Sequence, residues 1–482
     1  MLKSAAMRPL LWLMLLAGLL SFAFQGSRGL WEPDEGRYTN VALQMMSSGD
    51  YLMPHRHHGM LHVTKPPVTY WALAGSFGAF GHNEWAARLP MALAYLLTIF
   101  LVYRLGRLFT PARPWLPALL YAISPVPFLA ANAITTDTLL AFAETAAVLA
   151  YALRRFGDGG PRHLDLMWLL FGLAFMIKGP PGLLPLAAIV LFEWRSGGLT
   201  ALRGLLRPIG LALFVVAGLG WFAFITQQRP ELLDYFLRHE VVDRVASATH
   251  DRNSQWYGGF SVYLPTLLVG ALPWLLALLA GRRRPGVARD AQMRFLLLWT
   301  LLPLLVFMLS RSRLPFYILP LFVPLALLAS KALADIAFGT RHAALLAFWL
   351  VCLLSLKGAL AYWPYKDDAR AFAAELRPML PAQPNELAFV GAKASYGLNF
   401  YLGAEIEKLS LDDLRGPQPL SDAEYDQGLR SELHEAEPRR YFLVPEKQQA
   451  AFLAVIGERT ELKPQRLGTA RRYAVYRIER AP

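Results

Sequence analysis

The sequence predicts a polytopic α-helical membrane protein that carries a small α/β domain at its C-terminal end. Of its 482 residues, 55% are hydrophobic and 17% are charged, and the mean hydropathy is +0.33. A soluble core has no place for so much apolar surface. About eleven stretches also approach the roughly 20 apolar residues that a helical span requires. A polar tail follows them, and in it helix-like and strand-like patterns alternate.

The predicted spans follow the apolar runs of the chain. They cover residues 8–25, 86–103, 114–132, 138–153, 164–177, 180–194, 205–226, 259–281, 293–310, 314–333 and 342–363. The fifth and sixth are short, so we expect about 11 to 13 spans in total. The first run can alternatively be read as a cleaved signal peptide, with small residues from Ser21 to Ala23.

The basic residues indicate the orientation in the membrane. The net charge is +13 and the pI is near 9.8, but lysines and arginines recur in groups between spans, which does not favour nucleic-acid binding. These groups follow the second, fourth, sixth and eighth spans, and Lys3 and Arg8 precede the first. The positive-inside rule makes that side cytoplasmic. The first outer loop is an exception that needs a reason, because it holds Arg28, Arg37, Arg56 and Lys65.

We therefore predict two domains in a bacterial inner-membrane protein. Residues 1–365 form the membrane domain, with long outer loops at about 26–85 and 228–258, and residues 366–482 form a periplasmic α/β domain. The tail has helix-like segments at 368–377 and 446–456 and strand-like segments at 386–390, 440–444 and 472–478. The only cysteine, Cys352, lies inside a predicted span, so no intrachain disulfide can form.

Charged residues gather directly after the first predicted span. Residues 30–38, LWEPDEGRY, hold three carboxylates and one arginine. Acids at the end of a span can simply be solvated there. This segment, however, continues through SGDYLMPH into TKPPVTYW, whose aromatic and apolar residues suit the membrane interface. A loop that returns to the membrane with Asp34, Arg37 and Lys65 can place a base and two cations in one cavity.

Seven different short motifs lie along the chain. They are WEPDEGRY, SGDYLMPH, TKPPVTYW, TTDT at 135–138, MIKG at 176–179, RHE at 238–240 and RLPFYILP at 313–320. In this order, over roughly residues 8–365, the set resembles the bacterial aminoarabinose transferases and the wider group of polyprenyl-phosphate-dependent membrane glycosyltransferases with the GT-C fold. The tail resembles that family only in its position and its α/β character.

The resemblance implies that a sugar passes, with inversion, from a polyprenyl phosphate to an acceptor on the outer face. The acid of the first outer loop acts on the acceptor in this family, and Asp34 matches it; Glu35 completes the acidic pair, and Asp137 is the second acid. An oxocarbenium-like transition state requires an acceptor held opposite the departing phosphate. A carboxylate that orients the acceptor or takes its proton suits that task.

Cations near the leaving phosphate lower the barrier to its departure. Lys65 and Arg37 match family positions that engage the phosphate, and Lys178 and Arg313 are further candidates predicted on the same side of the membrane. The alternative for each cation is that it reaches the interface from the end of a span without any catalytic role.

A divalent metal ion is a further expectation. Some relatives hold one through a carboxylate before the TKPP lysine and a histidine of the HE pair. His239 and Glu240 match the pair, but Thr64 stands in place of the carboxylate, and threonine is a poor ligand. His62 can replace it, as can the nearby His55, His57 and His58. Clustered histidines are also common at surfaces without a metal.

The sequence leaves the sugar and the acceptor open. The acceptor can be lipid A, a polysaccharide or a protein, and a protein O-mannosyltransferase is the alternative enzyme, since an acidic pair in the first outer loop suits that group too. A lipid or sugar transporter is the alternative outside enzymes. A transporter should show paired broken helices in two similar halves, whereas the halves of this chain differ and its charges cluster outside the spans.

Overall fold

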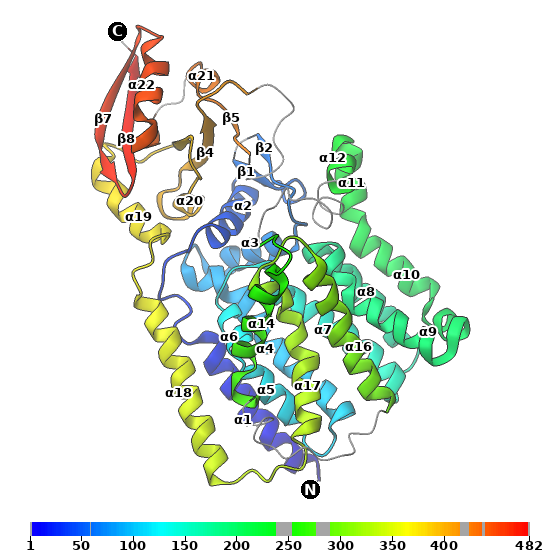
Figure 1. Ribbon diagram of the computed structural model, residues 1–482. Helices are drawn as coiled ribbons and strands as arrows, with labels where there is room; N and C mark the ends of the chain where they lie inside the picture. Colours follow the sequence, from blue (N-terminus) through cyan, green and yellow to red (C-terminus); the bar gives the residue numbers. More distant parts are fainter. Residues whose placement is uncertain are drawn as a thin grey trace. The chain divides into compact units, whose positions relative to one another are not determined.

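The computed structural model describes residues 2–57, 59–237, 253–275, 290–414, 424–435 and 439–480. The chain divides into two compact units, one of residues 1–25 and 88–361 and the other of residues 26–87 and 362–482 (Figure 1). This division differs from the boundary predicted at 365, because residues 26–87 group with the tail. The backbone explains the grouping: Ala369 N donates to Leu30 O at 2.8 Å, and Glu32 N donates to Asp367 O at 2.9 Å.

The regular elements in the described part of the first unit are all helices. Its elements are α1 (Leu2–Phe22), α4 (Glu84–Phe109), α5 (Trp115–Ala122), α6 (Pro125–Ala130), α7 (Thr136–Phe156), α8 (Arg162–Lys178), η1 (Pro180–Leu183), α9 (Leu184–Leu205), α10 (Pro208–Phe214), η2 (Val215–Leu219), α11 (Gly220–Gln228), α12 (Glu231–Asp234), α14 (Gly258–Gly270), α16 (Ala291–Leu309), η4 (Pro315–Leu321), α17 (Phe322–Ala332) and α18 (Thr340–Tyr362).

Seven helices in the described part of the chain are long and apolar enough to cross a membrane, and Arg8–Phe22 and Gly258–Gly270 are shorter apolar helices. All eleven predicted spans overlap helical segments. The predicted span 114–132 is divided into α5 and α6, because Ser124 is extended before Pro125, as a residue preceding proline prefers. Neither α5, with 8 residues, nor α6, with 6 residues, is long enough to span a membrane alone.

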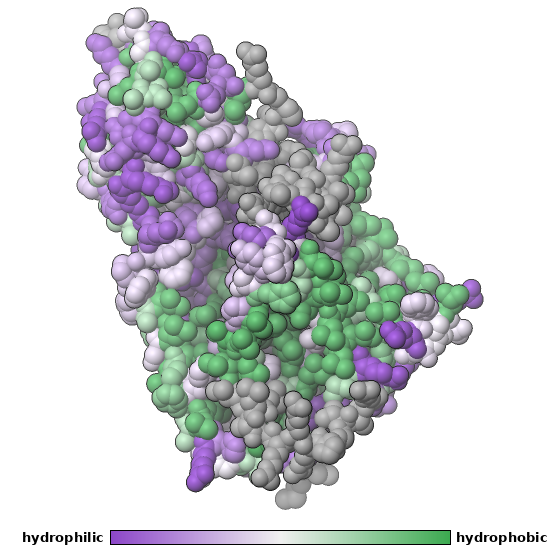
Figure 2. All heavy atoms as spheres, viewed as in Figure 1, coloured by the Kyte–Doolittle hydropathy of each residue, from purple (hydrophilic) through white to green (hydrophobic). Residues whose placement is uncertain are grey.

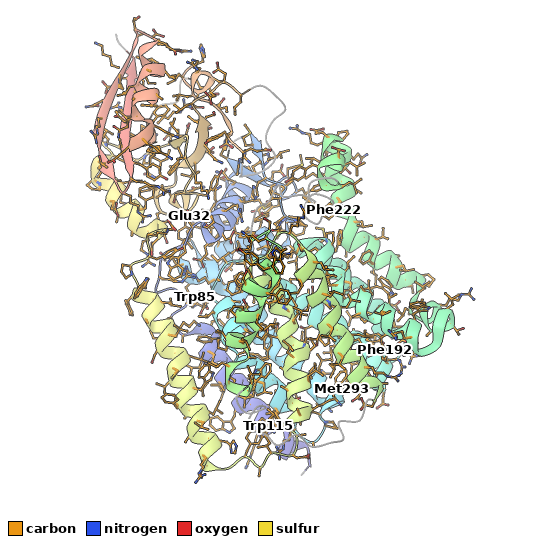
Figure 3. All side chains as sticks on the ribbon, in the orientation of Figure 1. Glu32, Trp85, Trp115, Phe192, Phe222 and Met293 are labelled. Atoms are coloured by element: carbon orange, nitrogen blue, oxygen red, sulfur yellow. The ribbon has the colours of Figure 1, made fainter. Side chains whose placement is uncertain are left out.

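Apolar side chains both fill and coat the first unit. In its interior, the Phe295 ring lies 5.5 Å from Phe192, which Figure 3 labels, and 5.9 Å from Trp299, measured between centroids. On the outside, only 11% of the apolar window of α18 and 22% of that of α10–α11 are buried within the protein. Figure 2 shows hydrophobic side chains over the visible face of these helices. Such surfaces are suited to lipid, where helices satisfy their own backbone groups.

The second unit combines the predicted first outer loop with the tail. Its elements are α2 (Asp34–Ser48), β1 (His55–His57), β2 (Met60–Leu61), α3 (Val68–Phe80), α19 (Ala369–Leu376), η5 (Arg377–Met379), β3 (Glu386–Val390), α20 (Gly397–Leu402), β4 (Glu405–Ser410), β5 (Gln427–Gly428), α21 (Leu429–Glu432), β6 (Arg440–Pro445), η6 (Glu446–Gln448), α22 (Gln449–Gly457), β7 (Leu462–Ala470) and β8 (Tyr473–Arg480).

A six-stranded sheet in the order β5-β4-β3-β6-β8-β7 forms the centre of the tail. The strands from β5 to β6 are parallel, and β8 and β7 add an antiparallel edge. Apolar residues of α19 and α20 pack in one core, and those of α21 and α22 pack in another. The predicted small α/β domain is confirmed, although the sequence did not predict β4, β5 or β7.

A buried ion pair joins the two stretches of the second unit. Arg56 of β1 donates through Nε to Oδ1 of Asp426 at 2.7 Å, and both side chains are almost wholly buried. The other carboxylate oxygen of Asp426 accepts the backbone N–H of Lys408 at 2.8 Å. Burial alone raises the pKa of Asp426, but the nearby His57 and Arg56 hold it below its ordinary value. The acid therefore remains ionised and fastens β1 to the sheet.

Replacing Asp426 with asparagine should destabilise the second unit strongly. Asp426→Asn leaves the buried guanidinium of Arg56 without its counter-charge, which typically costs about 3–5 kcal/mol of unfolding free energy. The measurement is denaturant unfolding of the detergent-purified protein, followed by limited proteolysis of the tail. Asp413→Asn is the control, because Asp413 forms only an exposed pair with Arg430. Equal stability of the two variants would contradict the assigned role of the ion pair.

Candidate active site

The acidic segment lies at the start of α2, which begins at Asp34 directly after Pro33. Asp34 and Glu35 occupy the first helical turn, where the helix dipole favours negative charge. Glu32 lies just before the helix. The three carboxylates have different surroundings, and these surroundings separate their roles.

The carboxylate of Glu32 binds the tail. Its Oε1 accepts a hydrogen bond from Ser395 Oγ at 2.9 Å and from Gly397 N at 2.6 Å, while its Oε2 is buried without a hydrogen bond. Burial raises the pKa of Glu32 to about 7 despite these donors. A Cβ atom at Gly36 would lie 2.4 Å from the carboxylate, and one at Gly397 would lie 2.8 Å from it. Both glycines therefore leave space for this acid, which Figure 3 labels.

Glu35 is held by a neighbouring arginine. Its Oε2 accepts from Arg28 Nη1 at 2.6 Å and from Trp31 N at 2.9 Å, and its Oε1 accepts from Arg28 Nη2 at 2.8 Å. The guanidinium of Arg28 also lies 4.1 Å from the centre of the Trp31 ring. The residue is buried. Its carboxylate thus closes the turn that precedes α2.

Asp34 is the most accessible of the three acids. Its side chain is 40% exposed, and its Oδ1 accepts a hydrogen bond from Arg37 Nη2 at 2.5 Å. The Arg37 side chain is mostly buried and lies 5.4 Å from the ring of Tyr38. Lys65, in the same unit, is half-buried and donates from Nζ to Thr64 O at 2.7 Å. The structure therefore pairs Asp34 with Arg37 and leaves part of the carboxylate open to a reactant.

A second cluster lies in the first unit. Asp137 sits in the first turn of α7, where Thr135 Oγ1 accepts a hydrogen bond from its backbone N–H. It forms a buried ion pair with Lys178, which ends α8. The Nζ atom of Lys178 lies 4.1 Å from the centre of the Tyr317 ring. Glu144, two turns further along α7, is also buried. Two predicted site residues, Asp137 and Lys178, are thus brought together.

Arg313 supports the backbone around it. Its Nη1 donates to Asn253 O at 2.6 Å and to Gln255 O at 2.8 Å, and its Nη2 donates to Met308 O at 3.1 Å. Its Nε is buried without a hydrogen bond. A Cβ at Gly258 would come within 2.6 Å of Nη1, so the chain needs glycine at that position.

The predicted metal ligands are only partly described. His239 and Glu240 lie outside the described residues, as does His58. His62 is buried, and its Nε2 lies 2.9 Å from Thr64 Oγ1. The predicted metal site at these residues stays a prediction.

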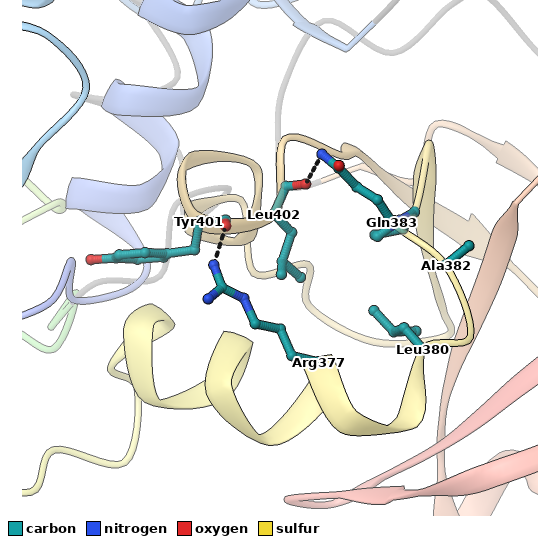
Figure 4. A pocket seen from close by; sticks show the side chains of 7 residues that line it. Arg377, Leu380, Ala382, Gln383, Tyr401 and Leu402 are labelled. Carbon is teal, nitrogen blue, oxygen red and sulfur yellow. Dashed lines mark hydrogen bonds between the residues drawn. The ribbon is translucent and has the colours of Figure 1, made fainter.

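The described part of the second unit contains two cavities. One, of about 940 Å³, is bordered by Glu32, by residues 363–368 and by Lys393, Arg471 and Arg472. The other, of about 380 Å³, is shown in Figure 4. In it, Arg377 donates to Tyr401 O at 2.9 Å and Gln383 donates to Leu402 O at 3.3 Å. These two side chains satisfy carbonyls at the end of α20, which is a structural task.

Sequence reasoning missed the partners that distinguish the acids. No role was predicted from the sequence for Glu32, Arg28, Glu144 or Tyr317. For Glu32 the available signal was the glycine at position 36, which follows the three acids immediately. Its meaning depends on Ser395 and Gly397, more than 350 residues away, and no local pattern reveals them.

Comparison with known proteins was made by sequence and by structure. Residues 64–225 match the model of the dolichyl-phosphate-mannose-protein mannosyltransferase family. The chain is 33% identical over 341 residues to the undecaprenyl phosphate-α-4-amino-4-deoxy-L-arabinose arabinosyl transferase 2 of Pseudomonas fluorescens, covering 69% of this chain and 60% of that protein. It is 31% identical over 393 residues to the corresponding transferase 2 of Sodalis glossinidius, covering 78% and 69%. The chain thus spans about 60% of the length of the first curated relatives that it matches.

The structure of ArnT from Cupriavidus metallidurans, determined with undecaprenyl phosphate bound, has the same fold. The TM-score is 0.77 at 20% identity, and the match covers 97% of each chain. The predicted fold class, a helical membrane domain of GT-C type with a small α/β domain, is confirmed by this likeness and by the described helices and sheet.

The buried carboxylate of Glu32 should make stability depend on pH. Its folded-state pKa of about 7 lies above the ordinary value of 4.5, so between these values the folded protein holds a proton that the unfolded chain releases. The unfolding free energy should therefore fall as the pH rises from about 4.5 to 7, by roughly 2–3 kcal/mol.

Thermal unfolding of wild type, Glu32→Gln and the exposed control Glu446→Gln at pH 5 and pH 8 measures this effect. Glu32→Gln should lose part of the pH dependence that wild type and the control retain. An identical pH dependence in all three proteins would show that Glu32 does not titrate as proposed.

Proposed function

We propose that this chain, which belongs to the family of undecaprenyl phosphate aminoarabinose transferases, transfers a sugar with inversion from a polyprenyl phosphate to an acceptor on the outer face of the membrane. One observation carries the proposal. Of the three acids at the start of α2, Glu32 and Glu35 are held inside the fold, which leaves the Asp34 carboxylate partly exposed beside Arg37.

The chain is a multi-pass protein of the inner membrane, as the seven apolar helices among its described residues and its relatives indicate. The ArnT structure that shares its fold was determined with undecaprenyl phosphate, which supports a lipid phosphate as the donor here. We place the second unit on the periplasmic side, because the basic loops predicted between spans favour the opposite side as cytoplasmic.

Asp34 is assigned the reactive role. A partly exposed carboxylate can orient the acceptor hydroxyl or amine and take its proton as the sugar is transferred. Arg37 fixes the position of the Asp34 carboxylate. Glu35, expected from the sequence as a catalytic acid, is assigned a positioning role, since Arg28 and the Trp31 N–H already occupy its oxygens. Asp137 is the candidate second acid, with its charge balanced by Lys178.

Cations are assigned to the leaving phosphate. Lys65 and Arg37 of the second unit can stabilise the charge that develops there. In the first unit, Lys178 lies between Asp137 and the Tyr317 ring, an arrangement that holds its ammonium group in place. Arg313 is assigned a supporting role, because three backbone carbonyls already accept its hydrogen bonds. A divalent ion held by His239, Glu240 and His62 stays part of the proposal, and no step depends on it.

The acceptor distinguishes two candidate enzymes. The curated relatives are named as aminoarabinose transferases that use undecaprenyl phosphate, and for an enzyme of that kind we expect lipid A or a polysaccharide as the acceptor. The match of residues 64–225 to the dolichyl-phosphate-mannose-protein mannosyltransferase family favours a protein instead. Mass spectrometry of lipid A, glycoproteins and surface polysaccharide from a deletion strain separates them, because each acceptor loses a different mass. Lipid-linked sugar that crosses the membrane without any transfer would favour a transporter instead.

Asp34→Asn should remove nearly all transfer without unfolding the protein. The change keeps the size of the side chain but removes the charge that acts on the acceptor, and a loss of about 100- to 10,000-fold in kcat is expected. The measurement is sugar transfer from a polyprenyl-phosphate donor by the purified protein, with Asp413→Asn as the exposed control. Turnover by Asp34→Asn at the wild-type rate would refute the assignment.

The proposed topology can be tested by cysteine labelling in a Cys352→Ser background, since Cys352 is only partly buried in α18. Ser47→Cys, at an exposed position of α2, and Ser421→Cys should react with an impermeant maleimide once the outer membrane is permeabilised. Gly286→Cys should stay unlabelled. Ser421 and Gly286 lie outside the described residues and are chosen from the predicted topology. Labelling at Gly286 with none at Ser47 would reverse the orientation.

A further inference from the structure

Three buried glutamates meet in the second unit, apart from the acidic segment of α2. Glu386 begins β3, Glu407 lies in β4 and Glu432 ends α21. Each residue offers one carboxylate oxygen, and these oxygens lie within 4.8 Å of one another. Like charges this close repel each other strongly when water is excluded. The cluster therefore needs positive charge.

The described cations near the cluster do not balance its negative charge. Arg440 lies with Nε 2.9 Å from Glu386 Oε1 and with Nη1 2.5 Å from Glu432 Oε1, and Arg56 is paired with the adjoining Asp426. Four carboxylates thus face two guanidinium groups, an excess of two negative charges when all the acids are ionised. The side chain of Lys408 projects from the other face of β4, since successive residues alternate, and lies 4.7 Å from the ring of Tyr425.

A histidine at the cluster is the second, independent observation. His57 of β1 is only 4% exposed. Its Nδ1 lies 3.5 Å from Glu407 Oε1 and its Nε2 lies 3.4 Å from Asp426 Oδ2, yet neither nitrogen makes a hydrogen bond to a described residue. Among the described residues Glu407 Oε2 also lacks a hydrogen bond, while Glu386 Oε1 and Glu432 Oε1 have only their ion-pair contacts with Arg440. Buried polar atoms without hydrogen bonds are rare and costly, so several of them close together indicate a ligand.

We propose that Glu386, Glu407, Glu432 and His57 bind a divalent transition-metal ion, Zn²⁺ or Mn²⁺. The ion's two positive charges match the excess of the cluster. Carboxylate oxygens and an imidazole nitrogen together suit these ions. Ligand atoms about 2.1 Å from an ion lie at most about 4.2 Å apart, so the spread of the three glutamate oxygens requires side-chain adjustments of less than about 1 Å. His57 already lies 3.5 Å from one of these glutamates, Glu407.

This site differs from the predicted one at His239, Glu240 and His62, and its role is structural. His57 belongs to the stretch 26–87, whereas the three glutamates belong to the tail. An ion held by all four residues attaches residues 26–87, the stretch that includes Asp34, to the sheet. Protonation of the glutamates is the competing way to relieve the excess of negative charge. Burial and the neighbouring acids raise the pKa of Glu407 to about 11.

Metal analysis of the full-length protein in detergent tests the proposal. The protein is stripped with EDTA, incubated with ZnCl₂ or MnCl₂, freed of unbound ion by gel filtration and analysed by mass spectrometry of the elements. We expect Glu407→Gln and His57→Gln each to bind about one ion per chain fewer than wild type and the exposed control Glu446→Gln. His239→Gln should keep the ion that these two variants lose. The thermal midpoint of wild type should rise by roughly 3–8 °C on reloading.

The stripped proteins control for misfolding. Glu407→Gln relieves charge repulsion, so stripped Glu407→Gln should melt no lower than stripped wild type. Wild type that binds no ion and melts at the same temperature with and without metal would overturn the proposal in favour of protonation. Binding that His239→Gln abolishes and Glu407→Gln retains would overturn it in favour of the other site. Neither result bears on the transfer reaction, which Asp34→Asn tests separately.

Discussion

The ion pair between Arg56 and Asp426 holds the two separate stretches of the second unit together. Both groups are closed off from water, so each is stable only with the other present. Once β1 is anchored, Glu32 reaches Ser395 and Gly397, and α2 begins at a fixed place. The position of Asp34 thus depends on contacts made by the tail.

The first unit also contains a buried ion pair, in this case between two helices. Most of its surface suits lipid, yet Asp137 and Lys178 form an ion pair in its interior. Removing two charges from water is costly, and a well-packed apolar pair is often at least as stable. Ionisable residues inside a membrane protein are therefore functional candidates first. The Tyr317 ring beside Lys178 adds a contact that orients the ammonium group.

The sequence predicted the helices better than the roles of the acids, and the reason is distance along the chain. A membrane span is a local property of apolar length, so all eleven predicted spans overlap helical segments. The strand β4 was missed because EIEKLS carries charges at positions that are buried in the fold, where Glu407 belongs to the glutamate cluster. In the acidic segment, Glu32, Asp34 and Glu35 look alike until their partners are known, and those of Glu32 lie more than 350 residues away.

The structural acids explain why one carboxylate in the segment can remain reactive. An exposed acid on a flexible loop would lose much of its effect, because transfer requires the acceptor to be held in one orientation. Here Glu32 fixes the entry to α2 from the tail, and Glu35 closes the preceding turn through Arg28. Asp34 follows Glu32 and precedes Glu35 in the sequence, so the contacts of these two neighbours set its position. The same arrangement explains the glycine at position 36, since a larger residue would displace Glu32 and shift the start of the helix. On the proposed function, the motif therefore combines one reactive acid with two acids that hold it in place.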